Sequence, residues 1–272
     1  MNIDIKDLKK VLSVEEQREL LEYIGEDYKK VPYLYLDLEE YGIGKDNVNT
    51  WYYDNDEKIK CIFLLYYNCL HIYSRSLDLR LENIILNTIN ILNPHIIITT
   101  EEIGNYLKNV LNEQYRTICS CILDGTDVST KGIHYNVEQA VRKDLNEIAD
   151  LFLKSEHYQN VYSKEILLKQ LENRYDSKFG RSFIVRDNGK IVGSLSTYGE
   201  NDKFAIVSGL IIDASYGKPG VAMSLAKWMS KVLGEEGKRS LAINSIENER
   251  SIKFALKMGN VKVANIYEFI RL

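Results

Sequence analysis

The stretch GLIIDASYGKPGVAMSL, residues 209–225, decides the fold of the surrounding chain. It runs from branched apolar residues typical of a buried strand, through a turn with Gly217 and Gly220, directly into apolar residues at helical spacing. A helix begins with unpaired N–H groups and about half a positive charge, so a glycine turn that opens a helix is suited to bind a phosphate. The stretch therefore predicts a strand, a phosphate-binding turn and a helix, against the alternative that the glycines only make a tight turn.

The residues on either side of this stretch alternate between strand and helix patterns. Asn188 and Gly189 lie between two apolar strands and predict a hairpin with a type I′ turn. Asp144, with Glu147 three residues later, is predicted to cap the first helix. The predicted elements are strand 135–141, helix 144–155, a helix from Ser163, strands 182–187, 190–200 and 203–213, a helix from 222 to the GEEG at 234–237, strand 239–246, helix 248–259 and strand 261–272.

The N-terminal half shows a related order of elements. They are predicted as helix 14–28, strands 49–54, 59–67 and 69–74, helix 80–92, strand 95–100, helix 102–112 and strand 115–123. This is the C-terminal order with its first strand and one helix missing, which predicts a degenerate duplicate. At the position of the glycine turn stands SRSLDLRLEN, residues 74–83, which contains no glycine.

The segment LDGTDVSTKGIHY, residues 123–135, gathers Gly, Asp, Ser and Thr between two structured patterns, as a linker does. We therefore expect a mixed α/β (α+β) fold in two parts. The first is an α/β domain over 1–125, followed by a linker over 126–133. The second is a domain over 134–272.

Residues 133–272 resemble the GNAT superfamily of acyl-CoA N-acyltransferases on two motifs. The central motif of that family is Gln or Arg, two residues, Gly, one residue, then Gly or Ala, between the fourth strand and the third helix. Here GKPGVA, residues 217–222, supplies Gly220 and Ala222, while Gly217 stands where the Arg or Gln should be. The second motif lies in NERSIKFALKMGN, which supplies Asn248, Ser251, Phe254 and Gly259 at the family's spacing.

The resemblance implies a mostly antiparallel sheet flanked by helices and acetyl-CoA as cofactor. It implies that the fourth strand splays from the fifth, so that the backbone of Leu210, Ile211 and Ile212 pairs with pantetheine and polarises the thioester carbonyl. Gly209 is consistent with a bulge in that strand. The residues expected to bind the cofactor are Leu210, Ile211, Ile212, Gly217, Lys218, Gly220, Val221, Ala222, Asn248 and Ser251.

The catalytic groups are not assigned by these motifs. Many members of the family use a Tyr of the fourth helix to protonate the leaving thiolate, and the matching residue here is Ala255. Tyr267, Tyr198 and a water relay ending at Ser208 are the candidate substitutes. Candidates for the general base are Glu200, His157 and Tyr158, whereas Asp213 is expected to order its loop.

The two motifs and the missing catalytic groups are compatible with two functions. The first is an acetyl-CoA-dependent N-acetyltransferase that acts on a primary amine of a small molecule or peptide, with the N-terminal half shaping the acceptor pocket or an interface. Well-presented amines can react largely through proximity, which favours the enzyme. The alternative is a non-catalytic acyl-CoA-binding or regulatory module, favoured by the missing Tyr and the missing Arg or Gln.

Composition limits the partners and the compartment. The first 132 residues carry 14 Lys and Arg against 22 Asp and Glu, and the remainder carries 21 against 17. The mildly basic second half suits a small polyanion but lacks the dense basic stripe of a nucleic-acid surface, and the acidic first half is a candidate homodimer surface. The longest apolar run, residues 61–67, is too short to span a bilayer, and the N-terminus lacks an apolar signal segment, so we expect a cytoplasmic protein without membrane contact.

The four cysteines are expected to be buried free thiols. A C-x-C pair at Cys119 and Cys121, with no second pair and no nearby His, makes a poor zinc site. No metal is therefore expected.

Overall fold

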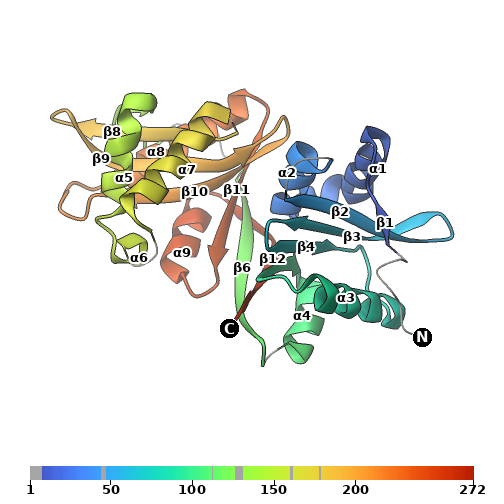
Figure 1. Ribbon diagram of the computed structural model, residues 1–272. Coiled ribbons are helices and arrows are strands. Elements are labelled where there is room, and N and C mark those ends of the chain that lie inside the picture. Colours follow the sequence, from blue (N-terminus) through green and yellow to red (C-terminus); the bar gives the residue numbers. More distant parts are fainter. Residues whose placement is uncertain (1–7, 44–46, 112, 126–130, 160–161, 178) are drawn as a thin grey trace. The chain divides into compact units, whose positions relative to one another are not determined.

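The computed structural model describes residues 8–43, 47–111, 113–125, 131–159, 162–177 and 179–272 (Figure 1). The chain divides into two compact units. The first takes in the chain up to Ile122, together with Asn244–Asn248 and Lys262–Leu272, and the second takes in Leu123–Ile243 and Glu249–Val261. The division into domains over 1–125 and 134–272 stays a prediction, and residues 126–130 of its linker lie outside the described residues.

The first unit is built on a mostly antiparallel sheet. Its elements are β1 (Lys9–Lys10), α1 (Val14–Ile24), the 3-10 helix η2 (Gly25–Lys29), α2 (Pro32–Tyr41), β2 (Val48–Asn55), β3 (Lys58–Tyr66), β4 (Cys69–Tyr73), α3 (Leu79–Leu92), β5 (Ile96–Thr100), α4 (Glu101–Val110), β6 (Tyr115–Gly125) and β12 (Val261–Arg271). The strand order is β1-β2-β3-β4-β5-β12-β6. Strands β4 and β5 run parallel, whereas β1–β2, β2–β3, β3–β4 and β5–β12 are antiparallel. The last strand groups with this unit because Ile266–Ile270 pair with Ile96–Thr100.

Two elements that the sequence analysis takes as missing from the first half are present. Strand β1 pairs with Tyr52 and Trp51 of β2, and the predicted helix 14–28 ends at Ile24, before α2 begins with Pro32 in its first turn. Helix α2 shows no helical periodicity because five consecutive residues, Leu34–Leu38, are all buried. The first unit therefore has the complete strand–helix order of the second.

The second unit has the order predicted from the sequence with two differences, since it adds the short α6 and the predicted last strand, β12, groups with the first unit. Its elements are β7 (Val137–Gln139), the 3-10 helix η3 (Arg142–Asp144), α5 (Leu145–Phe152), the short α6 (Glu156–Gln159), α7 (Lys164–Ser177), β8 (Ser182–Asp187), β9 (Lys190–Glu200), β10 (Phe204–Ile212), α8 (Val221–Glu235), β11 (Arg239–Ser245) and α9 (Glu249–Lys257). The strand order is β11-β10-β9-β8-β7, with β10 and β11 parallel and the other neighbours antiparallel. The predicted mixed, mostly antiparallel fold is confirmed.

Two local predictions in this unit have different outcomes. The hairpin between β8 and β9 turns through Asn188 at φ 49° and Gly189 at φ 79°, as a type I′ turn requires. Asp144 stands at the predicted N-cap position of α5, but its side chain does not cap that helix. Its carboxylate reaches back to accept the N–H of Val141 at 2.9 Å and also accepts from Arg186, and α5 has no side-chain cap. A tight 3-10 turn precedes α5, so the carboxylate lies nearest the start of that turn.

Helices cover both faces of the second sheet (Figure 1). Helices α5 and α7 pack on one face through Leu145, Ile148, Leu167 and Leu171, against Ile184 and Ile191. Helix α8 packs on the other face through Val221, Leu225, Met229 and Leu233, against Phe183, Val185 and Leu195. Successive residues of β8 therefore point to opposite layers, as the two-residue period of a strand dictates.

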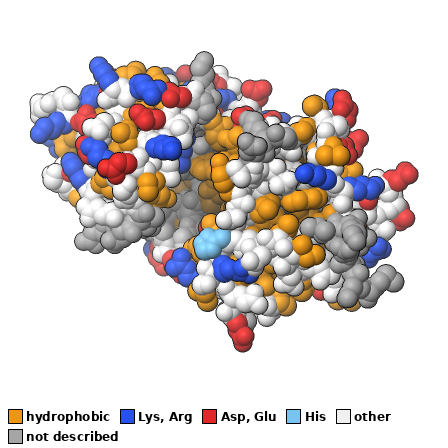
Figure 2. Space-filling view, viewed as in Figure 1, with side chains coloured by type: hydrophobic (Ala, Val, Ile, Leu, Met, Phe, Trp, Pro, Cys, Tyr) orange, Lys and Arg blue, Asp and Glu red, His pale blue; other side chains and the backbone are white. Residues whose placement is uncertain are grey.

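The remaining general features concern thiols, membrane spans and surface charge. All four cysteines are free thiols; Cys61 and Cys121 are buried, and Cys69 and Cys119 are half-buried. Within the described residues, every helix is too short or too polar to cross a bilayer. On the face that Figure 2 shows, Lys and Arg side chains lie among Asp and Glu side chains, and the described residues there form no continuous basic stripe.

Candidate active site

Strand β10 leaves its neighbour β11 halfway along its length. Phe204–Val207 pair in parallel with Arg239–Ala242, and the pairing stops there, although β10 continues to Ile212. The backbone from Ser208 to Ile212 therefore has no β11 ladder partner. The splay between the fourth and fifth strands, which the resemblance implies, is present.

The same segment of β10 carries a bulge against β9. Ser208 pairs with Ser196 and Ile211 with Ser194, so that Gly209 and Leu210 together oppose the single residue Leu195. Gly209 has φ 66°, the left-handed conformation that glycine adopts in such a bulge. The bulge predicted at Gly209 is confirmed. It turns the backbone of β10 at the point where the strand has left β11.

The N-terminus of α8 follows β10 after a short turn. Gly220 is the N-cap at φ 95°, no side chain caps the helix, and the first helical bond runs from the Ser224 N–H to the Gly220 carbonyl at 2.9 Å. The N–H groups of the first turn are thus not taken by a capping side chain, which is the arrangement that binds phosphate. A Cβ on Gly220 would lie 3.5 Å from the side chains of His134 and Tyr135.

The chain just after the linker braces this turn, a feature that the sequence analysis missed. The Tyr135 hydroxyl donates to the Pro219 carbonyl at 3.1 Å. The Ser224 hydroxyl accepts the backbone N–H of His134 at 3.0 Å. These partners are about 90 residues apart in the sequence, so no local pattern could indicate them.

Lys218 is held by a carboxylate. Its ammonium donates to Asp187 at 2.8 Å, and this bond raises the pKa of Lys218 and lowers the pKa of Asp187. A Cβ on Gly217 would meet nothing within 4 Å, so the glycine there is not required by crowding. The predicted phosphate contact of Lys218 therefore has to compete with Asp187.

A cavity of about 270 Å³ lies beside the bulge, between the α5–α7 layer and strands β9 and β10. The described residues that line it are Phe152, Tyr158, Tyr162, Leu167, Gln170, Leu171, Arg174, Ser196, Tyr198, Ser208 and Gly209. The ring of Phe152 lies against Gly209, so the bulge is part of the wall. The bulge of β10 thus borders the cavity within the same segment that lacks a β11 partner.

The comparisons with known proteins agree with this geometry. Residues 143–259 match the family model for the Acetyltransferase (GNAT) family. These residues form a GNAT domain. The family implies transfer of an acyl group from acyl-CoA. A comparison with curated proteins found no matching relative.

Three solved structures share the fold of nearly the whole chain. A GNAT-family acetyltransferase from Colwellia psychrerythraea is 14% identical with a TM-score of 0.64, and the match covers 97% of this chain and 99% of that one. A tandem GNAT protein from the clavulanic acid biosynthesis pathway is 11% identical with a TM-score of 0.61, covering 97% and 98%. A GCN5-related N-acetyltransferase from Sphaerobacter thermophilus is 13% identical with a TM-score of 0.61, covering 97% and 96%. At these identities the likeness concerns the fold, and it extends over both halves of the chain.

The GNAT domain brings together two of the three residues predicted as catalytic. Tyr198 and Ser208 line the same cavity. Tyr267 belongs to the first unit, where its hydroxyl donates to Asn105 at 2.8 Å and its ring covers Gly104, and it is not one of the described residues that line the cavity. Ala255 is buried in α9 and offers no proton donor.

The second motif lies at the start of α9. The helix begins at Glu249, so Asn248 stands immediately before it and Ser251 in its first turn. Their contact with the pantetheine arm stays a prediction, as do the contacts predicted for the rest of the cofactor-binding residues.

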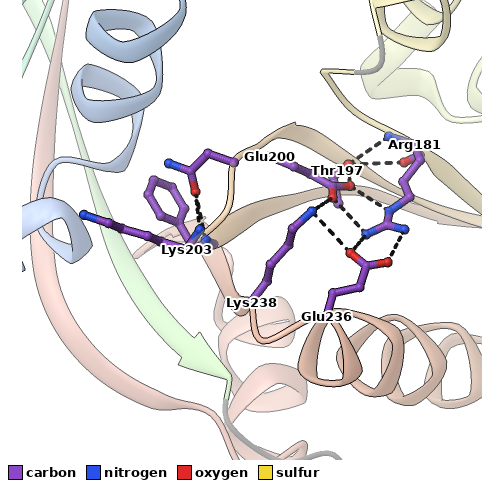
Figure 3. Close-up of polar contacts among 8 residues, drawn as sticks. Arg181, Thr197, Glu200, Lys203, Glu236 and Lys238 are labelled. Atoms are coloured by element: carbon purple, nitrogen blue, oxygen red, sulfur yellow. Dashed lines mark hydrogen bonds and ion pairs between the residues drawn. The ribbon is translucent and has the colours of Figure 1, made fainter.

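Glu200, a candidate for the general base, and Asp213, which is expected to order its loop, both form ion pairs. Glu200 accepts two bonds from Arg181 at 2.9 Å each, one from the Thr197 hydroxyl at 2.7 Å and one from Lys238 at 3.2 Å (Figure 3). Asp213 accepts from Lys154 and Ser215, and these bonds lower its pKa to about 2. The Glu200 carboxylate therefore serves to hold neighbouring side chains together and is not placed as a general base. Asp213 orders its loop, as expected. The side chain of His157 lies outside the described residues.

The first unit lacks the strand separation, the bulge and the uncapped helix N-terminus that are present in the GNAT domain. Its corresponding strands β4 and β5 stay paired from Cys69–Ile96 to Ile72–Thr99, and β3 and β4 pair without a shift. Asp78 caps α3 by accepting the Leu81 N–H at 2.8 Å. This places a carboxylate where α8 has an uncapped glycine, so α3 lacks the uncapped N-terminus that is predicted to bind phosphate in α8.

Proposed function

We propose that this protein is an acetyl-CoA-dependent N-acetyltransferase that transfers acetyl to a primary amine of a small molecule or peptide. The observation that carries the proposal is the path of β10 and its pairing with the neighbouring strands. Beyond Val207 it leaves β11, and at Gly209 it bulges beside a cavity. We infer that this one backbone segment lies between the cofactor on its β11 side and the acceptor in the cavity.

The residues of the GNAT domain fit the cofactor. Bound acetyl-CoA would supply an acetyl group activated as a thioester. The uncapped N–H groups of Val221 and Ala222 suit the pyrophosphate, together with the turn at Gly217, Lys218 and Gly220. The backbone of Leu210, Ile211 and Ile212, which pairs with β9 but has no partner in β11, suits the amides of the pantetheine arm, and Asn248 and Ser251 suit its other side.

The chain's own groups then have three tasks. A backbone N–H of the bulged segment donates to the carbonyl oxygen, which gains negative charge when the amine attacks. The acceptor ammonium loses a proton, which we route through water and the Ser208 hydroxyl to the bulk solvent. As the new C–N bond forms and the C–S bond breaks, the departing thiolate takes a proton, for which the Tyr198 hydroxyl is the donor that we propose.

The second candidate is a non-catalytic acyl-CoA-binding module. The specific observation in its favour is the burial of Ala255 at the position of the usual Tyr. The absence of a carboxylate from the described cavity lining also favours it, because a general base then has to be water. Both candidates require that CoA binds to α8.

Calorimetry with CoA and acetyl-CoA, followed by thiol release over a panel of primary amines, separates these functions. Binding of both cofactors with amine-dependent thiol release supports the enzyme. Binding without turnover over the panel supports the module. A chain that binds neither cofactor contradicts both.

A further inference from the structure

Three serines lie side by side across three neighbouring strands of the GNAT domain. Ser182 of β8 pairs with Ser196 of β9, and Ser196 pairs with Ser208 of β10, so these three residues form a serine row. We infer that the hydroxyls of Ser196 and Ser182 continue the route of the acceptor's proton from Ser208 to the solvent. This inference rests on the proposed acyl transfer and adds the residues that carry the proton away.

The hydroxyls of the serine row are close enough to pass a proton along. The Ser182 and Ser196 hydroxyls are hydrogen-bonded at 2.8 Å, and either can be the donor. Ser196 and Ser208 both line the cavity of about 270 Å³. Residues directly opposite on antiparallel strands have Cβ atoms about 5 Å apart, a gap that one water in the cavity can bridge. Each hydroxyl both donates and accepts a hydrogen bond, as a proton relay requires.

The serine row connects the cavity with a second hollow. Ser182 and Ser196 line this hollow, whose volume of about 10 Å³ is room for about one water molecule. Ser196 is 3% exposed, whereas Ser182 is half-buried and so is partly open to solvent. The buried hydroxyl of Ser196 therefore lies between the proposed acceptor cavity and a hollow nearer the solvent.

The side chains around the serine row do not offer a final acceptor for the proton. The described residues of either lining that can titrate are Tyr158, Tyr162, Arg174, Tyr175, Arg181 and Tyr198. Arginine and tyrosine side chains already carry their proton at neutral pH, and these described linings contain no Asp or Glu. An acceptor in the cavity leaves room for few waters, so its proton has to leave along the wall.

An ion-pair network holds the strands together beside the two bonded serines. The Thr197 N–H donates to the Arg181 carbonyl at 2.8 Å, and the Arg181 N–H donates to the Thr197 hydroxyl at 2.9 Å. Glu200 binds both of these residues, and Glu236 binds the Arg181 guanidinium (Figure 3). Because Arg181 precedes one bonded serine and Thr197 follows the other, the network fixes the register of the serine row.

The relay leaves the serine row unchanged. The acceptor ammonium gives one proton to the row at Ser208, and its nitrogen keeps the electron pair of the broken N–H bond. Each hydroxyl then accepts one proton and releases another, and water in the second hollow passes the excess proton to the solvent. The nitrogen uses the electron pair to attack the thioester carbonyl.

The experiment measures acyl transfer on both sides of the pKa of the acceptor's amine. An amine that the unmodified chain turns over is assayed with acetyl-CoA below and above its pKa, which is about 8 for an α-amine and about 10.4 for an alkylamine. In Ser196→Ala and in Ser182→Ala, kcat should fall roughly 10-fold below that pKa, where the ammonium binds. Above it the free amine binds with no proton to lose before attack, so kcat should approach the unmodified value.

Two further variants separate the relay from a structural role. Ser182→Thr keeps the hydroxyl and should keep the unmodified pH profile. Ser194→Ala is the matched control and should keep it too, because Ser194 is a fully buried serine of the same strand whose hydroxyl has no partner among the described residues. It is also not one of the described residues that line either hollow.

The outcomes distinguish the relay from the acyl transfer on which it rests. A loss of kcat that is the same at every pH, or an equal loss in Ser194→Ala, would overturn the relay while the acyl transfer stands. Absence of turnover by the unmodified chain over the whole amine panel would contradict the acyl transfer and the relay with it. A loss confined to low pH in both alanine variants supports the relay.

Discussion

The ring of Phe152 lies against Gly209, with its Cζ 2.9 Å from the position that a Cβ on Gly209 would occupy. Phe152 belongs to α5 and Gly209 to the bulge of β10, so this contact joins the helix layer of the cavity to the strand segment that has left β11. Both the positive φ and this contact require glycine at position 209.

Gly209→Ala should therefore destabilise the protein and impair acyl transfer. We expect a loss of about 2–4 kcal/mol in the free energy of unfolding, about 1–2 from the left-handed backbone and the rest from crowding against Phe152. Gly189→Ala is the matched control, because Gly189 has φ 79° but nothing within 4 Å of its Cβ position. Urea unfolding measures the loss of stability in each of the two variants. Equal losses in the two variants would show that Phe152 does not restrict the site.

Gly220→Glu should abolish CoA binding while the fold persists. The new carboxylate would stand at the N-terminus of α8, where it repels the pyrophosphate but interacts favourably with the helix dipole. Gly220→Ala carries the same backbone strain at φ 95° without the charge. Calorimetry should show CoA affinity at least about 100-fold weaker for Glu than for Ala. The same affinity in both variants would mean that phosphate binds elsewhere.

Tyr198→Phe should lower kcat by roughly 100-fold, the lower end of what general acid catalysis contributes, with little change in CoA affinity. The phenyl ring keeps the stacking with Arg174 and removes only the hydroxyl. Tyr267→Phe removes a hydroxyl that is bonded to Asn105 in the first unit. It should leave kcat unchanged and cost at most about 1 kcal/mol of stability. If steady-state kinetics show that kcat falls in Tyr267→Phe and not in Tyr198→Phe, Tyr267 and not Tyr198 is the general acid.

Lys154→Met should make stability less sensitive to acid. The hydrogen bond from Lys154, with help from Ser215, lowers the pKa of Asp213 from its usual 3.8 to about 2. A lowered carboxylate pKa stabilises the folded state above pH 3.8, and that stabilisation is lost as the pH falls towards 2. Urea unfolding between pH 2 and 5 should therefore show a shallower acid dependence in this variant. Lys143→Met, which removes an exposed lysine, should keep the original slope.

The local signals in the sequence were sufficient for most of the second unit. Asn188 and Gly189 indicated their turn because only residues that tolerate positive φ can occupy it. Gly209 was consistent with a bulge for the same reason, and the helix after Gly220 followed from its apolar spacing. Helix α2 could not be predicted in this way, because the burial of Leu34–Leu38 on all sides erases the periodicity.

By itself, the sequence determined most of the order of strands and helices, without β1, α2 and the short α6, together with the glycine turn before α8 and the family of residues 143–259, because these depend on residues close together in the chain. The tertiary structure alone decided which candidates meet. It placed Tyr198, Ser208 and Arg174 around one cavity, fixed Glu200 in an ion network and bonded Tyr267 to Asn105. These relationships join residues from separate elements, and only the packing of helices on the sheet brings such residues within reach of one another.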